Sequence, residues 1–164
     1  MDKKLYLLRH AKSSWDDADL DDHERPLNAR GREAAGRIGR HLRDEGIVAE
    51  LVLCSSAARA RETLELLLLD PSAEVLVEHA LYGAGVEEMV ARLRRIDAAV
   101  ASVLLIGHNP DIEALAQTLT VEEELTPAFP TGALAAIRVP VASWADLRPG
   151  IAKLTSFVTP RELA

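Results

Sequence analysis

Short apolar runs alternate with helical patterns along most of this chain, and this alternation limits the folds that it can form. The first four runs show no polar–apolar alternation, as is typical of buried parallel strands. With two later runs, the expected strands cover residues 5–8, 51–54, 75–77, 103–106, 133–139 and 151–157. Strands that alternate with helices predict a layered α/β domain with a mostly parallel central sheet.

Four amphipathic helices are expected between the strands, because apolar residues recur there at spacings of three and four. Asn28 is the expected N-cap of the first helix and Gly46 its stop, and Ser55 or Ser56 is expected to cap the second. Asn109-Pro110 is expected to open the fourth helix. The expected core residues are Ala34, Ile38 and Leu42, then Leu64, Leu67 and Leu68, then Val86, Met89, Val90, Leu93 and Ile96, and finally Ile112, Leu115 and Leu119.

The length of 164 residues suits one domain with a full core. We expect that domain over residues 1–158, with a surface loop at 120–131 and a C-terminal tail at 159–164. The apolar run near the start is too short for a signal-peptide core or a membrane span, so a cytoplasmic location is expected.

Composition argues against several kinds of partner. The net charge of −7 disfavours nucleic acids and acidic membranes, and aromatic residues, at 4%, offer few surfaces for stacking bases. A single cysteine, Cys54, excludes an internal disulfide framework and a zinc finger.

Polar residues follow three of the expected strands at the point where each strand ends. Arg9-His10 follows the first strand, Arg59 lies one turn after the second, and His108 follows the fourth. Ligands of open α/β sheets bind outside these carboxyl ends. Arginine binds phosphate oxygens through two hydrogen bonds, and a neutral histidine is a competent nucleophile. The pattern therefore predicts a phosphate-handling site.

In such a site, His10 would attack phosphorus and form a phosphohistidine that water later hydrolyses. Positive charge around His10 is expected to lower its pKa and favour the neutral form that attacks. A protonated His108 would donate a hydrogen bond to an oxygen of the transferred group.

Five sequence blocks occur in order along the chain. They are Arg9-His10-Ala11-Lys12-Ser13, Arg25-Pro26-Leu27-Asn28-Ala29-Arg30-Gly31, Ser56-Ala57-Ala58-Arg59-Ala60-Arg61-Glu62-Thr63, Gly107-His108-Asn109-Pro110 and Phe129-Pro130-Thr131-Gly132-Ala133. Together they resemble the ordered signature of the histidine phosphatase superfamily, over most of the chain from the first strand to about residue 137. Within that superfamily, the short length and the Arg25 block resemble the small bacterial phosphohistidine phosphatase branch.

This resemblance implies a three-layer α/β/α sandwich of the phosphoglycerate mutase-like type and a phosphatase that needs neither metal nor cofactor. It casts His10 as the nucleophile and Arg9, Arg59 and His108 as the phosphate pocket. Two further residues, Lys12 and Ser13, are expected to contact substrate.

The chain departs from mutase-type members of the superfamily at two places. Asp16 stands where those members have a phosphate-contacting asparagine, and the general-acid glutamate is out of register, with His79 in its place and Glu78 one residue away. An alkoxide leaving group needs an acid to protonate it, whereas the imidazole of a phosphohistidine leaves readily. The sequence still offers Asp16, Asp19, Glu78 and His79 as proton donors.

The function expected is therefore dephosphorylation of protein phosphohistidine, with a phosphorylated protein as partner. The alternatives are a phosphatase of small phosphorylated metabolites, including sugar phosphates and nucleotides, and a catalytically idle phosphate- or phosphoprotein-binding module. A mutase is disfavoured by the missing acid. The sequence leaves the oligomeric state open.

The acidic run 16–24 is expected to form a mobile lid beside the pocket. Asp17, Asp19 and Asp21 match the first ligand positions of a calcium loop, but Asp22 replaces the required glycine and Asn28 the terminal glutamate. No metal site is therefore expected there.

Other prominent side chains receive structural interpretations. Arg25 is expected to anchor the acidic loop through nearby carboxylates, Trp15 to lie at the pocket mouth and Trp144 to pack on the surface. Cys54 is expected to be a buried small residue. A solvated helix face is expected from Arg30, Arg32, Arg37, Arg40 and Arg43.

Overall fold

The computed structural model describes residues 1–121 and 127–164, which form a six-stranded sheet in the order β3-β2-β4-β1-β5-β6 flanked by helices. The strands β1 to β4 run parallel, whereas β5 runs antiparallel to both β1 and β6. This confirms the mostly parallel sheet. The strands are β1 (Lys3–Arg9), β2 (Leu51–Ser55), β3 (Glu74–Glu78), β4 (Ser102–Gly107), β5 (Leu134–Val139) and β6 (Lys153–Val158).

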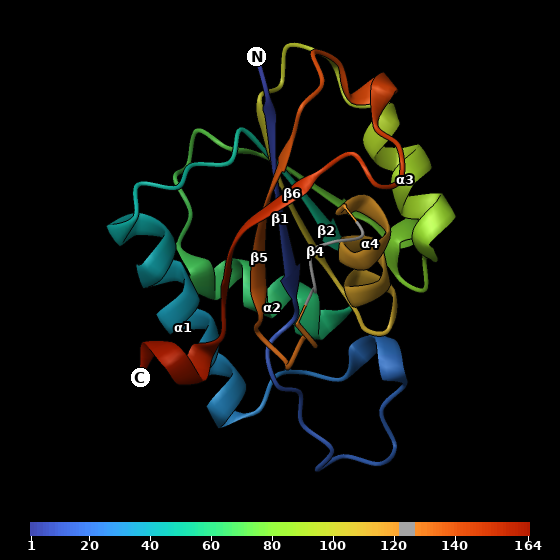
Figure 1. Ribbon diagram of the computed structural model, residues 1–164. Helices are drawn as coiled ribbons and strands as arrows, with labels where there is room; N and C mark the ends of the chain where they lie inside the picture. The colour runs from blue at the N-terminus through green and yellow to red at the C-terminus, as the bar shows by residue number, and fades with distance from the viewer. Residues whose placement is uncertain (122–126) are drawn as a thin grey trace.

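The helices cover both faces of the sheet (Figure 1). On one face, α1 and α2 share a hydrophobic cluster with Tyr6 and Leu8; on the other, α3 and α4 share a cluster with Leu5 and Leu7. Successive strand residues point to opposite faces, so β1 contributes to both layers. The three-layer α/β/α sandwich is confirmed. Its helices are α1 (Ala29–Asp44), α2 (Ala58–Leu67), α3 (Val86–Arg94) and α4 (Asp111–Leu119).

The start of α1 matches the prediction and fixes the helix against the loop that follows β1. The Oδ1 atom of Asn28 accepts a hydrogen bond from the backbone N of Gly31 at 2.8 Å. A Cβ atom on Gly31 would lie 2.0 Å from the carbonyl oxygen of Lys12. Glycine therefore allows α1 to approach this loop closely.

The arginines of α1 form the expected solvated face: Arg30, Arg32, Arg40 and Arg43 are exposed, and Arg37 is partly exposed. Arg32 donates a hydrogen bond to the carbonyl oxygen of Leu27 at 3.0 Å, and Arg43 donates to that of Leu67 at 2.6 Å. Both guanidinium groups therefore tie α1 to neighbouring segments.

Helix α2 differs from the prediction at both ends. Its N-cap is Ala57 rather than Ser55 or Ser56, because the Ser55 hydroxyl accepts a hydrogen bond from Ala57 N and also bonds to the ring of His108. Leu68, expected in the core, is 68% exposed and adopts a left-handed conformation with φ +50° directly after the helix. That turn directs its side chain away from the core.

Two further expectations, at α4 and at Trp144, need correction. The N-cap of α4 is Pro110 rather than Asn109, although Asn109 Oδ1 still accepts a hydrogen bond from the backbone N of Glu113 at 3.2 Å. Trp144 is fully buried, not on the surface, and its Nε1 donates to the Val100 carbonyl oxygen at 2.8 Å. With its polar atom satisfied, the indole is readily accommodated in the core beside α3.

Strand β3 is not buried as predicted, because it lies at the edge of the sheet and leaves Val75 and Val77 nearly half exposed. Of the loop expected at 120–131, residues 122–126 lie outside the described part of the chain. Residues 159–164, expected as a tail, include the 3-10 helix η4 (Pro160–Leu163), which lies against α1. No helix in the described ranges is long and apolar enough to cross a membrane.

Candidate active site

The parallel sheet brings the two central histidines together. Arg9, the last residue of β1, lies opposite Gly107, the last residue of β4. His10 and His108 follow directly, and their ring centroids are 5.0 Å apart. The adjacency expected from the strand ends is therefore present.

All six residues predicted to contact the phosphoryl group line one cavity of about 350 Å³, which we call the active-site cavity. It lies at the carboxyl ends of β1 and β4, as expected for a parallel sheet. Four further residues, Trp15, Arg25, Asn109 and Thr131, complete its lining. The six predicted residues are Arg9, His10, Lys12, Ser13, Arg59 and His108.

His10 is held in one orientation and one tautomer. Its Nδ1 atom lies 2.7 Å from the carbonyl oxygen of Ala11, and because this oxygen only accepts, Nδ1 carries the proton. The unprotonated Nε2 accepts a hydrogen bond from Nε of Arg59 at 3.4 Å. Burial, reinforced by His108, Arg59 and Arg9, lowers the pKa of His10 to about 3. The expected neutral form is therefore found, although burial contributes more than positive charge.

His108 presents an unpaired nitrogen. Its Nε2 lies 2.7 Å from Oγ of Ser55, which already accepts a hydrogen bond from Ala57 N. The Ser55 hydroxyl proton is then free to donate to Nε2, which places the His108 proton on Nδ1. That Nδ1 is buried without a hydrogen-bond partner among the described residues. Such a nitrogen is poised to donate to a ligand.

The protonated His108 considered from the sequence does not match this environment. Burial, followed by the positive charge of Arg59, lowers the pKa of His108 to about 4, against the opposing influence of Asp22. His108 is therefore neutral at pH 7. Its hydrogen bond to a phosphoryl oxygen would come from neutral Nδ1–H, or from proton uptake that accompanies an anion.

Arg9 is fixed by the loop that precedes β5. Its Nη1 donates to the carbonyl oxygen of Phe129 at 2.8 Å, and the backbone N of Gly132 lies 3.0 Å from the carbonyl oxygens of both Arg9 and His10. The Nε atom of Arg9 is buried and has no partner in the described part of the chain. Arg9 thus offers a second unpaired donor at the active-site cavity.

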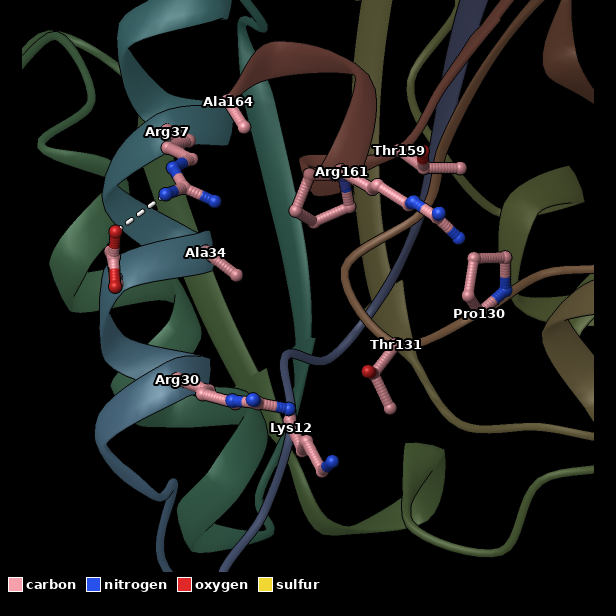
Figure 2. Close-up of a pocket in the computed structure, with 11 residues that line it drawn as sticks. Lys12, Arg30, Ala34, Arg37, Pro130, Thr131, Thr159, Arg161 and Ala164 are labelled. Carbon is pink, nitrogen blue, oxygen red and sulfur yellow. Dashed lines mark hydrogen bonds and ion pairs between the residues drawn. The ribbon is translucent and has the colours of Figure 1, made fainter.

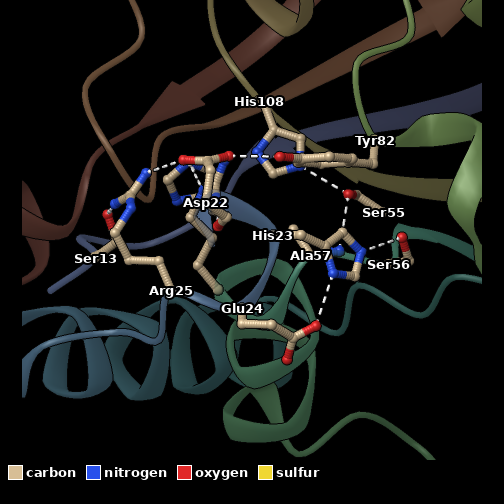
Figure 3. A network of polar contacts seen from close by, with 12 residues as sticks. Ser13, Asp22, His23, Glu24, Arg25, Ser55, Ser56, Ala57, Tyr82 and His108 are labelled. Atoms are coloured by element: carbon tan, nitrogen blue, oxygen red, sulfur yellow. Dashed lines mark hydrogen bonds and ion pairs between the residues drawn. The ribbon is translucent and has the colours of Figure 1, made fainter. Parts of the chain in front are cut away.

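A carboxylate that the sequence did not single out for the site neutralises Arg59. Asp22, in the 3-10 helix η1 (Asp22–Glu24), accepts a hydrogen bond at Oδ2 from Nη2 of Arg59 at 3.1 Å. The same oxygen accepts from the Tyr82 hydroxyl at 2.7 Å, and Oδ1 accepts from Arg25 at 3.0 Å (Figure 3). The Tyr82 hydrogen bond, followed by the two arginines, holds the pKa of Asp22 well below its usual range.

Arg25 fastens the acidic loop, as expected. Besides its ion pair with Asp22, it donates a hydrogen bond to Ser13 Oγ, and its Cζ lies 3.8 Å from the ring centroid of Trp15. Trp15 is 76% exposed and lines the cavity, which places it at the mouth as predicted.

A second polar cluster borders the site. His23 Nε2 lies 2.8 Å from Ser56 Oγ (Figure 3). The same hydroxyl lies 3.1 Å from Nδ1 of His79. The ring of Tyr82 packs edge-on against both His23 and His108, with centroid distances of 4.8 and 5.8 Å. This arrangement connects the acidic loop to His108 at the end of β4.

None of the four proton donors offered by the sequence lines the active-site cavity. Glu78 forms a two-point ion pair with Arg92 at 2.8 and 3.0 Å, and this pairing lowers its pKa. His79 is engaged by Ser56, while Asp16 and Asp19 lie in the exposed acidic loop. Asp22, whose carboxylate pairs with the cavity-lining Arg59, stays ionised because its pKa is held well below its usual range.

Other chemistries find little support in this arrangement. Burial raises the pKa of the Cys54 thiol to about 12, so it is not a nucleophile at neutral pH. Within residues 1–121 and 127–164, no three His, Cys, Asp or Glu side chains form a group that could hold a metal ion.

Known proteins resemble this chain over most of its length. The histidine phosphatase superfamily (branch 1) profile matches residues 5–89. An uncharacterized protein of Mycobacterium tuberculosis is 38% identical over 94% of this chain and 100% of its own length. Phosphohistidine phosphatase SixA of Escherichia coli is 34% identical over 82% of this chain and 84% of its own.

Solved structures agree with these sequence matches. A candidate phosphohistidine phosphatase SixA from Nakamurella multipartitia superimposes with a TM-score of 0.86 and 31% identity, covering 98% of this chain and 97% of its own. The protein histidine phosphatase SixA complexed with tungstate gives a TM-score of 0.80 and 28% identity, covering 98% and 99%. The chain belongs to the histidine phosphatase superfamily and has its phosphoglycerate mutase-like fold.

Proposed function

We propose that this protein is a metal-independent phosphatase that removes the phosphoryl group from protein phosphohistidine through a phosphoenzyme on His10. Membership of the superfamily supports phosphatase activity. One observation supports phosphohistidine as the substrate: the cavity holds a candidate nucleophile but none of the candidate proton donors. Neutral His10 borders a cationic cavity, whereas none of the proton donors offered by the sequence lines that cavity.

In the first step, Nε2 of His10 attacks phosphorus while the bond from phosphorus to the substrate imidazole breaks. The departing nitrogen keeps the electron pair of that bond. When the other ring nitrogen of the substrate carries a proton, the leaving group is neutral imidazole, so no enzyme acid is needed. The Ala11 carbonyl stabilises the positive charge that His10 acquires, by accepting its Nδ1–H.

In the second step, water attacks the phosphorus of the His10 adduct. The bond from phosphorus to Nε2 breaks, its electron pair returns to Nε2, and the water proton passes to phosphate or solvent. Inorganic phosphate leaves, and His10 regains its neutral form, which its lowered pKa favours.

Hydrogen-bond donors without a protein partner suit this site to binding the oxygens of a phosphoryl group. Nε of Arg9 and Nδ1 of His108 are buried without partners among the described residues, and both residues line the cavity. Preorganised donors of this kind stabilise the charge on the equatorial oxygens during transfer. Arg59 adds a second guanidinium group once Asp22 is displaced.

The named relatives support the substrate class. SixA of Escherichia coli, 34% identical to this chain, is a phosphohistidine phosphatase by name. Among the described residues, none of the four proton donors offered by the sequence lines the cavity, and a phosphoramidate substrate needs no such acid. A phosphorylated protein is therefore the proposed partner, and small phosphorylated metabolites are the alternative that the experiment must separate.

The experiment compares a phosphohistidine-bearing protein with a panel of alkyl phosphates, in the presence of a metal chelator. Turnover of the phosphoprotein well above that of the esters is expected, together with an acid-labile labelled intermediate. His10→Ala should abolish both, whereas the control His41→Ala, at the far end of α1, should retain them. A preference for esters, or full activity of His10→Ala, would contradict the proposal.

A further inference from the structure

A second and larger cavity, of about 600 Å³, lies beside the active-site cavity, and we call it the basic groove (Figure 2). Lys12 and Thr131 line both cavities, so the two are adjacent. One wall is α1, and the other consists of η4 and the loop before β5. The groove is lined by Lys12, Arg30, Glu33, Ala34, Arg37, Pro130, Thr131, Thr159, Pro160, Arg161 and Ala164.

The groove is cationic although the chain as a whole is acidic. Four of its side chains are basic and one is a carboxylate, and that carboxylate, Glu33, is paired with Arg37 at 2.5 Å. Lys12, Arg30 and Arg161 form no ion pair within the described residues. Clustered like charges repel one another unless an anion compensates them. In a chain of net charge −7, such a cluster indicates a surface complementary to an anionic ligand.

Both walls of the groove are fixed relative to the active site. Gly132 has φ +78°, and a Cβ atom there would lie 2.6 Å from Cγ of Pro160. Glycine therefore allows η4 to lie close to the loop whose backbone bonds to the end of β1 at His10. On the other wall, Gly31 sets α1 against Lys12. A ligand in the groove is thus held at a defined position relative to the nucleophile.

We propose that the basic groove binds acidic side chains of the polypeptide that carries the phosphorylated histidine. This inference rests on the function proposed above. The cations come from three separate segments, the loop after β1, helix α1 and η4, so the positive charge is distributed along the groove. Its volume lies well within the range of cavities that hold whole ligands, larger than one more phosphate requires. An extended acidic segment fits this spread of charge better than a single second anion does.

The test uses two histidine peptides phosphorylated by phosphoramidate, identical except that one has Asp and Glu flanking the histidine and the other Ser and Gln. The native protein should show a kcat/KM about ten-fold higher for the acidic peptide than for the neutral one. Each exposed charge pair strengthens peptide binding by about a few-fold, and more than one pair is expected to form. The difference should lie in KM and shrink as salt is raised.

The variant is Arg30→Ala combined with Arg161→Ala, which removes two cations of the groove and leaves the active-site cavity unchanged. It should lose the preference for the acidic peptide and hydrolyse phosphoimidazole at the native rate. The matched control, Arg40→Ala, removes an exposed arginine of α1 that does not line the groove and should keep the preference.

Each contrary outcome has a distinct meaning. Equal turnover of both peptides, with phosphoimidazole hydrolysed, would overturn the groove inference and leave the proposed function standing. Failure on phosphoimidazole and on both peptides would overturn the proposed function itself. A double variant that keeps the acidic preference but loses turnover of a small bis-phosphate would show that the groove serves a metabolite and not a polypeptide.

Discussion

The carboxylate of Asp22 lies 3.1 Å from the Arg59 guanidinium, so the cation proposed to hold the transferred phosphoryl group is already paired with an anion of the protein. The pair is asymmetric, because Arg59 is buried whereas the Asp22 side chain is half exposed. A phosphoryl group with more negative charge can therefore displace Asp22 by moving the acidic loop rather than the arginine.

Asp22→Asn should strengthen the binding of inorganic phosphate by about two- to five-fold. The substitution removes a charge that competes for Arg59 and Arg25, and a partly exposed pair of this kind contributes at most about 1 kcal/mol. Isothermal titration with phosphate measures the effect. Weaker binding in Asp22→Asn would show instead that Asp22 supports the anion site.

His10 and His108 should both be neutral at pH 5.5. Burial lowers their pKa values to about 3 for His10 and about 4 for His108, far below the ordinary value of about 6.5. Nitrogen-15 NMR of the imidazole rings should report neutral rings protonated at Nδ1. A ring of His10 that is protonated at pH 6 would contradict the proposed nucleophile.

The same depressed pKa values predict acid sensitivity of the fold. Between about pH 6.5 and pH 3, the unfolded chain binds more protons at His10 than the folded protein does, so stability is complete above pH 6.5 and falls as the pH decreases. Each of the two histidines should remove about 2 kcal/mol of unfolding free energy between pH 7 and pH 5.

Denaturant unfolding of His10→Gln provides the comparison. This variant should lose about 2 kcal/mol less than the native protein over the same pH interval, while His41→Gln should follow the native protein. Parallel losses in the native protein and His10→Gln would show that burial does not depress this pKa.

Glu78→Gln should leave kcat on phosphohistidine and on alkyl phosphates unchanged. Glu78 forms an ion pair with Arg92 and lines a different cavity, so it is not placed to protonate a leaving group. A loss of ester hydrolysis in this variant would restore Glu78 as an acid and favour a small-molecule substrate.

The core of the site was predictable from the sequence because it depends on strand ends. Parallel strands place the residues that follow them at one edge of a sheet, and this geometry brings His10, His108 and Arg9 together. Arg59 was predictable because it lies in the first turn of the helix that follows β2.

Contacts made by loops were not predictable in the same way. The acidic run was recognised, but nothing in its composition distinguishes Asp22 from its neighbours until η1 turns it towards Arg59 and Tyr82. Tyr82 lies sixty residues further along the chain. Trp144 was misplaced for a similar reason, since its burial depends on a hydrogen bond to Val100 that periodicity does not encode.

The close approach of Pro160 to Gly132 affects the choice of the chain end that carries an affinity tag. It places η4, and with it residue 164, at the wall of the basic groove, whereas Met1 lies at the opposite end of the sheet (Figure 1). A polypeptide fused after residue 164 is tethered there at an effective concentration of the order of millimolar. If the groove binds acidic side chains as proposed, an acidic tag at that end becomes a local competitor, so kinetic measurements call for a tag before Met1.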